Sequence, residues 1–230
     1  MSRSTSKAAV KKAQGQLKVL VSSFGTLITA WRNDTEQIVQ LVAHYQELAS
    51  KCESVRRVRA RRHPVGESMG GMGMGMGGMG IPRLGWVCGQ ILAQVGLEVE
   101  SALLQIRAFD KRLKDTVSAM LFFYEDGMRI VANEPAELFD PACIFTSDHI
   151  LHIQQLAAAY AQELERKLAL THALYRAGAS LCDAARPPEA PSEADVITRV
   201  LAQYPDSCSA SCVDEESVQE YLLRNRINTD

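Results

Sequence analysis

The sequence predicts an all-α protein, an elongated antiparallel bundle of three coiled-coil-like long helices followed by two short C-terminal helices. Apolar residues recur at heptad or three-and-four spacing in three separate stretches of the 230-residue chain, which is typical of long packed helices. No stretch alternates apolar and polar residues with period two, so no sheet is expected. The aromatic fraction of 6% also suits a helical bundle better than a β-sandwich.

The first long helix is expected over residues 10–62, after a flexible N-terminus at 1–9. No proline interrupts its heptads between Val10 and Val55, and Asp34 is the one charged residue in the two core columns. Such a segment would be roughly 70 Å long. Trp31 is expected to be a buried anchor. The core columns are Val10, Ala13, Leu17, Leu20, Phe24, Leu27, Trp31, Asp34, Ile38, Leu41, Tyr45, Leu48, Cys52 and Val55.

The apolar stripe of this helix is wider than a two-helix seam requires, because further apolar residues follow the second core column. A stripe of that width asks for a fourth helix along its length. The two C-terminal helices are expected to be too short for that place, so we expect a hetero-oligomer in which a partner subunit supplies the helix. The expected interface residues are Val10, Leu17, Leu20, Val21, Ile28 and Val42.

A basic run ends the first helix and precedes a Met/Gly-rich linker at 63–83. The linker is rich in glycine without the period of collagen, so it predicts a flexible connection. The run can be a nuclear-import signal, a phosphate contact with nucleic acid or ribonucleoprotein, or a solvated helix end favoured by the helix dipole. It consists of Arg56, Arg57, Arg59, Arg61 and Arg62.

Residues 84–178 are expected to form the second and third bundle helices. A second heptad run starts near Leu92, and Gly127 is a natural C-cap for that helix. Ser147 or Thr146 can cap the third helix, which Gly178 ends. Within it, the spacing of Glu163 and Lys167 predicts a stabilising pair along the helix. The apolar face of this helix is Ile150, Ile153, Leu156, Tyr160, Leu164, Leu168, Thr171 and Leu174.

A Pro-rich linker at 179–191 leads to the C-terminal helical pair at 192–230. Ser192 with Asp195 forms a capping signature for the first of these helices, and Pro205 stops it. Asp214 is expected to cap the second, with Val213 and Val218 as a hydrophobic staple around it.

The residues predict no enzyme, no cofactor and no metal site. Cys208 and Cys212 lack a second ligand pair, and the histidines, including His149 and His152, read best as solvated surface groups. No nucleophile elbow or phosphate loop is present. The N-terminal residues lack the apolar core of a secretory signal, and no apolar run approaches the ~20 residues of a membrane span. We therefore expect no membrane partner, and a reducing compartment.

Three blocks in order resemble the cyclin-dependent kinase 2-interacting protein family. The first surrounds Trp31 at residues 24–31, and the second is the middle helix at 103–124. The third begins with Leu138-Phe139, continues through Tyr160 and Glu163, and ends with Glu216-Ser-Val-Gln-Glu-Tyr-Leu222. The resemblance covers about three quarters of the chain by this reading. The arginine run and the Met/Gly linker depart from the family pattern.

This resemblance implies a non-catalytic adaptor of the nucleus and cytoplasm. Its implied partners are AAA-type ATPases and cyclin-dependent or S-phase kinases, with roles in large-subunit ribosome maturation and in DNA replication and checkpoint control. The same heptads would equally serve a coiled-coil subunit of a tethering or kinetochore-type assembly.

Overall fold

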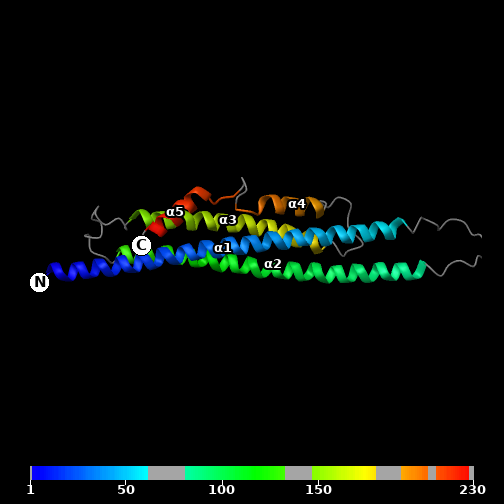
Figure 1. Ribbon diagram of the computed structural model, residues 1–230, viewed down its shortest axis with the longest axis horizontal. Helices are drawn as coiled ribbons and strands as arrows, with labels where there is room; N and C mark the ends of the chain where they lie inside the picture. Colours follow the sequence, from blue (N-terminus) through cyan, green and yellow to red (C-terminus); the bar gives the residue numbers. More distant parts are fainter. Residues whose placement is uncertain (1, 62–80, 133–146, 180–192, 207–210, 228–230) are drawn as a thin grey trace, which may run out of the picture. The chain divides into compact units, whose positions relative to one another are not determined.

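Five helices make up the regular structure of the part of the chain that the computed structural model describes, which is residues 2–61, 81–132, 147–179, 193–206 and 211–227 (Figure 1). No strand occurs within these ranges, and three of the helices are long, which confirms the predicted fold class. In chain order the helices are α1 (Ser2–Arg61), α2 (Ile81–Ala132), α3 (Ser147–Ala179), α4 (Glu193–Gln203) and α5 (Glu215–Ile227).

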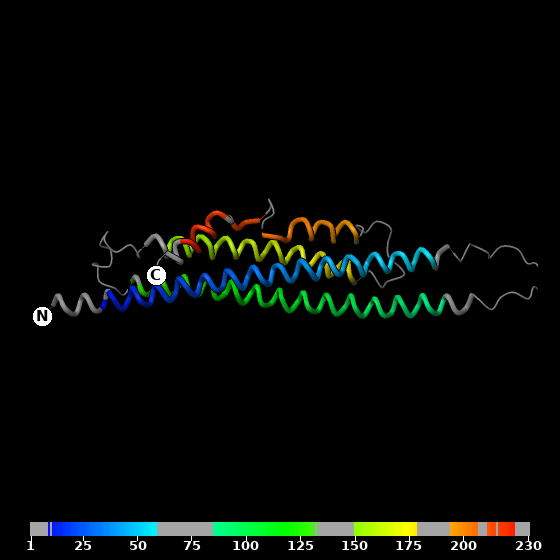
Figure 2. Tube along the Cα trace, in the orientation of Figure 1, coloured from blue at the N-terminus to red at the C-terminus, as the bar shows by residue number. Residues whose placement is uncertain are grey.

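Figure 2 follows the Cα trace of the long helices α1, α2 and α3. The chain divides into two compact units, and each of these three helices contributes residues to both. Unit 1 contains Met1–Val39, Ala108–Leu170 and Ala202–Asp230, and therefore includes α5. Unit 2 contains Gln40–Arg107 and Thr171–Leu201, and therefore includes most of α4.

In unit 1, α1 packs against α2, α3 and α5. The ring of Trp31 meets the ring of Tyr160 on α3 edge-on, with centroids 5.2 Å apart. The ring of Phe24 meets that of Tyr221 on α5 in the same way at 5.5 Å. These aromatic contacts join three helices around the stripe that the heptads predict, and edge-to-face pairs add to the stabilisation from burial.

The heptad columns of α1 form its buried face, as predicted. Trp31 and Phe24 are completely buried, so the expectation that Trp31 is an anchor is confirmed. The other buried column members are Ala13, Leu17, Leu20, Asp34, Ile38, Tyr45, Leu48 and Cys52. Among them Asp34 is the charged exception, and it forms a 2.6 Å ion pair with Arg112 of α2. Burial raises the pKa of the Asp34 carboxyl although the Arg112 charge opposes that rise.

In unit 2, a close approach between helices explains Gly178. A Cβ built on this residue would lie 2.8 Å from Leu103 of α2 and 3.0 Å from the hydroxyl of Tyr45 on α1. A larger residue would therefore fit only if the Leu103 methyl and the Tyr45 hydroxyl shifted, so this approach favours glycine. The helix α3 ends one residue later, at Ala179, so this glycine packs the helix as well as preceding its end.

Three predicted boundaries are wrong, each because a helix is longer than its caps indicate. Helix α1 begins at Ser2, so residues 2–9 are helical, and α2 begins at Ile81, inside the expected linker at 63–83. Gly127 does not end α2, which continues to Ala132. That glycine is instead buried, and a Cβ there would lie 3.5 Å from Ile150 of α3. Residues 62–80 and 180–192 lie outside the described ranges.

The middle helix is more apolar than the sequence reading assumed. Between Gly85 and Ile130, α2 is long and apolar enough to cross a membrane by length and composition alone. The expectation that no run reaches that length is therefore wrong, although the core helix of a soluble protein meets the same criterion. Only 22% of the most apolar window is buried, so α2 presents apolar surface beyond its core face.

Candidate interaction site

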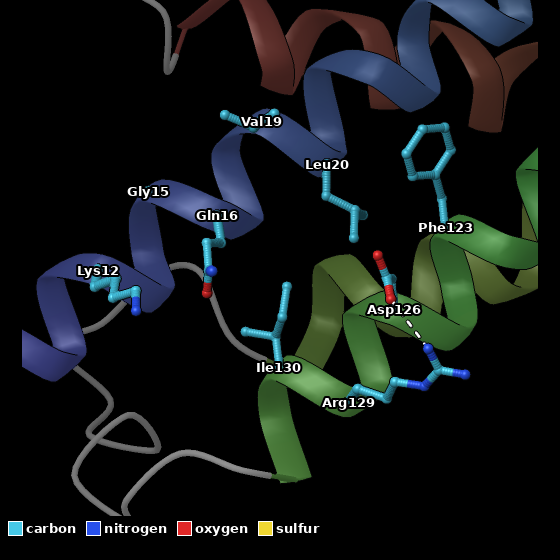
Figure 3. A pocket seen from close by; sticks show the side chains of 9 residues that line it. All are labelled: Lys12, Gly15, Gln16, Val19, Leu20, Phe123, Asp126, Arg129 and Ile130. Atoms are coloured by element: carbon cyan, nitrogen blue, oxygen red, sulfur yellow. Dashed lines mark hydrogen bonds and ion pairs between the residues drawn. The ribbon is translucent and has the colours of Figure 1, made fainter.

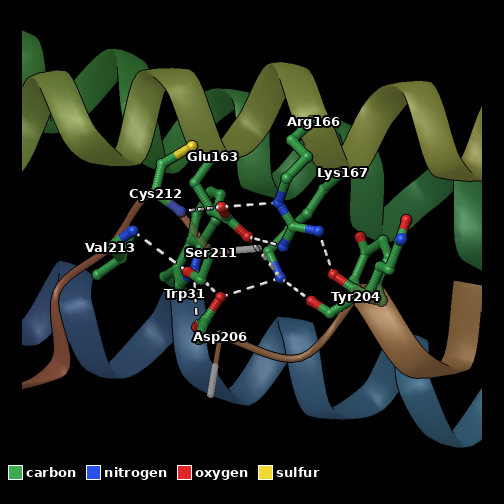
Figure 4. A network of polar contacts seen from close by, with 10 residues as sticks. Trp31, Glu163, Arg166, Lys167, Tyr204, Asp206, Ser211, Cys212 and Val213 are labelled. Atoms are coloured by element: carbon green, nitrogen blue, oxygen red, sulfur yellow. Dashed lines mark hydrogen bonds and ion pairs between the residues drawn. The ribbon is translucent and has the colours of Figure 1, made fainter. Parts of the chain in front are cut away.

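A buried ionic cluster in unit 1 centres on two charged residues of α3 (Figure 4). Glu163 and Lys167 lie one helical turn apart, and neither has any exposed surface. The Lys167 ammonium lies 3.3 Å from a Glu163 oxygen and 2.9 Å from a carboxylate oxygen of Asp206, which follows α4. It also donates a hydrogen bond to the backbone carbonyl of Tyr204.

Arg166 closes the other side of the cluster. Its guanidinium donates two hydrogen bonds to the Glu163 carboxylate, one of them from Nε at 2.9 Å, and a third to the backbone carbonyl of Gln203. The backbone amide of Cys212 donates to the same Glu163 carboxylate at 2.9 Å. Arg166 and Glu163 of α3 therefore bind the backbone before and after residues 207–210, at Gln203 and Cys212.

Trp31 brings α1 into this cluster. Its indole N–H donates to both carboxylate oxygens of Asp206, at 3.1 and 3.3 Å. The Lys167 ammonium also lies 4.4 Å from the ring centroid of Tyr204 and 5.9 Å from that of Trp31, close enough for cation–π attraction. One side chain thus connects α1 to the segment between α4 and α5.

The cluster is electrically balanced, with two carboxylates against one guanidinium and one ammonium. Balance matters because an unpaired buried charge is strongly destabilising, whereas a paired and hydrogen-bonded one is tolerated. Burial raises the pKa of Glu163, but the Arg166 and Cys212 hydrogen bonds and the Lys167 and Arg166 charges outweigh it and keep the pKa below 4.5. The arrangement fixes the chain leading into α5.

Helix α5 begins as the sequence predicts. The Asp214 carboxylate accepts hydrogen bonds from the Ser217 hydroxyl at 2.6 Å and from the backbone amides of Glu216 and Ser217, both at 3.2 Å, and these bonds lower its pKa. Val213 and Val218 are both buried, as a hydrophobic staple requires. The helix then lies on α1, where the hydroxyl of Tyr221 donates to the backbone carbonyl of Val21 at 2.8 Å.

The expected partner interface on α1 is wrong as a set, because the chain itself buries it. Helix α5 supplies part of the missing cover, through contacts of Tyr221 and Leu222 with the α1 turns at Val21 and Gly25. The side chain of Val10 lies outside the described residues. The buried members of the set are Leu17, Leu20, Val21, Ile28 and Val42.

A groove remains open in unit 1 between residues 12–20 of α1 and the last turns of α2 (Figure 3). It has a volume of about 690 Å³. Of the predicted interface residues whose side chains are described, Leu20 alone lines it, beside Val19, which is 68% exposed. Its α1 wall also includes Lys12, Gly15 and Gln16, and its α2 wall comprises Phe123, Asp126, Arg129 and Ile130.

The structure describes only part of the basic run. Arg56 and Arg57 are exposed on α1, and Arg57 pairs with Glu53 one turn earlier. The side chains of Arg59 and Arg61, and the whole of Arg62, lie outside the described residues. The run thus remains open to each of the roles given above.

The cysteines and histidines form no metal site within the described part of the chain, where no group of three potential ligands occurs. Cys212 is exposed, while Cys208 and the side chain of His149 lie outside that part. His152 is not a solvated surface group, because its ring packs edge-on against Tyr221 at 5.6 Å.

Sequence reasoning placed Glu163 and Lys167 on a helix but missed their burial. The available signal was spacing, since both residues continue the buried positions Ile153, Leu156 and Tyr160 at steps of three and four. No family model, curated protein or solved structure matches the chain.

Proposed function

We propose that this protein is a non-catalytic helical adaptor subunit that binds a helix of a partner protein in the groove of unit 1. The groove carries this proposal, because it is an open trough between two helices that is lined by both apolar and polar residues. Amphipathic helices are commonly bound in such troughs by a few large apolar anchors.

The lining of the groove suits an amphipathic helix. Val19, Phe123 and Ile130 supply apolar contact surface from two helices. Lys12 and the Asp126–Arg129 pair, with a 3.5 Å separation, add charges of both signs to the lining. A non-obligate protein interface has a similar mixture of apolar and polar surface.

The buried ionic cluster supports the same role. The four charged groups of Glu163, Arg166, Lys167 and Asp206 bind one another and backbone groups, so their contacts are those of a scaffold. They fix the segment before α5, and α5 in turn covers the α1 stripe beyond the groove. A rigid scaffold lowers the conformational entropy lost when a partner binds.

The identity of the complex rests on the resemblance to the cyclin-dependent kinase 2-interacting protein family. We propose a hetero-oligomer with AAA-type ATPases and cyclin-dependent or S-phase kinases, acting in large-subunit ribosome maturation and in DNA replication and checkpoint control. The proposed locations are the nucleus and the cytoplasm. The arginine run at 56–62 supports nuclear import or an indirect ribonucleoprotein contact.

A tethering subunit is the second candidate, because α2 is apolar enough by composition to associate with a membrane. Co-purification separates the two functions. The adaptor function predicts ATPases and ribosomal-precursor proteins with the tagged chain, whereas a tether or kinetochore subunit would recover membrane or centromere components.

The groove can be tested in the same experiment with Val19→Glu. Val58→Glu is a matched control, because Val58 also lies on α1 but belongs to unit 2, and it is 47% exposed, against 68% for Val19. Val19→Glu should lose the ATPase-containing partners while Val58→Glu retains them. Equal recovery with both variants would reject the groove as the binding surface.

A further inference from the structure

An exposed apolar stripe runs along α2 in unit 2. It comprises Trp86, Ala93, Leu97 and Leu104, whose three large side chains are 64%, 69% and 56% exposed. At 100° per residue these four positions fall within about 40° of one another and form a straight line about 27 Å long. The buried residues of the same segment lie on the opposite face of the helix: Cys88, Val95, Val99, Ala102 and Ile106.

We propose that this stripe binds the same stripe of a second copy of the chain, antiparallel and around a two-fold axis. The steps along the stripe are seven, four and seven residues, a spacing that reads the same in both directions. An isologous antiparallel contact requires such a symmetric spacing, because each apolar residue of the stripe must then lie level with an apolar residue of the other copy. A partner of unrelated sequence would not need it.

The register pairs large residues with complementary surface. Centred on residue 95, it places Trp86 level with Leu104 of the second copy, and Leu97 level with Ala93 of the second copy. The small Ala93 leaves room for the leucine that faces it. The two-fold axis repeats each of these two pairings, so four pairings cover the whole stripe.

Two hollows beside the stripe lie at the matching heights. One of about 300 Å³ is lined by apolar groups that include Leu103, Leu104 and Tyr175, with Glu100 and Arg107 as its charged members, and lies level with Trp86 of the second copy. The other, of about 360 Å³, is lined by apolar groups that include Ala93, Leu97 and Cys52, with Glu100 and Arg56 as its charged members, and lies level with Leu97 of the second copy. Aromatic and aliphatic anchors that fill such hollows supply most of the binding energy of an interface.

The edges of the stripe are also compatible with self-association. The two-fold axis brings together residues on the same side of the stripe, so Gln90 faces Ser101 of the second copy on one edge. On the other edge, Glu100 faces Gly89 of the second copy. No like charges are opposed there, which would otherwise disfavour the complex.

Self-association extends the proposed function without depending on it, because the stripe belongs to unit 2 and the groove to unit 1. A dimer joined through α2 would present two grooves, and the adaptor would be bivalent. Linked sites raise the apparent affinity for an oligomeric partner well above that of one groove.

The mass of the purified full chain tests the dimer. Sedimentation equilibrium should give twice 25.3 kDa for the wild type. Leu97→Glu and Ala93→Lys should each weaken the dimer at least ~30-fold, the loss typical of a hot-spot residue. The matched control Val19→Glu should remain dimeric. Circular dichroism of each variant shows whether its helices persist.

Mixing the two weakened variants tests the register. In a mixed dimer, the ammonium introduced by Ala93→Lys on one chain faces the carboxylate introduced by Leu97→Glu on the other. The same pairing occurs a second time in the mixed dimer, and there the native Ala93 and Leu97 remain in contact. The mixture should therefore recover the dimer. A wild-type mass of 25.3 kDa up to about 100 μM overturns the proposal. So does a mixture that stays monomeric, or a monomer that binds phosphatidylcholine–phosphatidylserine vesicles through Leu97.

Discussion

Lys167 of α3 and Asp206, which follows α4, form an ion pair inside unit 1, with Nζ 2.9 Å from the carboxylate and the lysine side chain completely buried. This pair joins residues that are far apart in the sequence. Because Trp31 of α1 binds the same carboxylate, one aspartate connects α1, α3 and the chain that leads to α5. The stability of unit 1 should therefore depend on each member of this small set.

Replacing Lys167 with methionine should lower the free energy of unfolding by about 3–5 kcal/mol, because the buried carboxylate of Glu163 and the mostly buried carboxylate of Asp206 lose a neutralising charge. Urea denaturation followed by circular dichroism measures this. The control is Lys114→Met on α2, where the lysine is exposed and the change should stay within about 0.5 kcal/mol. Equal effects of the two variants would contradict the cluster's structural role.

Replacing Trp31 with alanine should cost about 3–5 kcal/mol, the usual loss for truncating a buried aromatic side chain. Trp31→Phe keeps most of the packing and removes the hydrogen bond to Asp206, so it should cost less. A Trp86→Phe background isolates the fluorescence of Trp31, since Trp86 is 64% exposed. Emission typical of an indole in water from the folded protein, with no loss of stability in Trp31→Ala, would show that the heptad assignment is wrong.

Acid should destabilise unit 1 through Glu163. Its pKa is lower in the folded protein than its usual 4.5, so the unfolded chain binds the proton first as the pH falls. The contribution of Glu163 is therefore present above pH 4.5 and is lost as the pH falls through the folded pKa. Glu163→Gln should lower the free energy of unfolding at pH 7 and flatten its loss as the pH falls below 4.5. Parallel wild-type and variant curves below pH 4.5 would argue against this assignment.

Two glycines in helices should respond oppositely to alanine. Gly178→Ala in unit 2 should cost about 1–3 kcal/mol, because the Leu103 methyl and the Tyr45 hydroxyl must shift to admit its Cβ. Gly15→Ala on α1 should stabilise by about 0.5–1 kcal/mol, since nothing lies within 4 Å of its Cβ and alanine favours the helix. Thermal unfolding of both variants checks the sign, and a stabilising Gly178→Ala would refute the close approach of the helices.

The heptads predict most of the α1 core because the burial of one helix face is encoded locally, as in Phe24 and Trp31. What covers that face is not encoded locally. The cover near Val21 comes from Tyr221, which lies 200 residues away, so spacing alone could not separate α5 from a partner helix. For the same reason, the spacing of Glu163 and Lys167 alone indicates a pair on the helix surface. The other groups that Lys167 binds belong to Tyr204 and Asp206, which lie beyond the expected linker at 179–191 in the sequence.

Hydrogen exchange of the isolated chain and of the complex co-purified with it tests the adaptor proposal most directly. Partner binding should slow exchange in both walls of the groove, at residues 11–23 of α1 and 119–130 of α2. Residues 40–58 of α1, which belong to unit 2, should exchange at unchanged rates and serve as the internal control. Protection confined to unit 2, or identical exchange in both groove walls with and without the partners, would contradict the account.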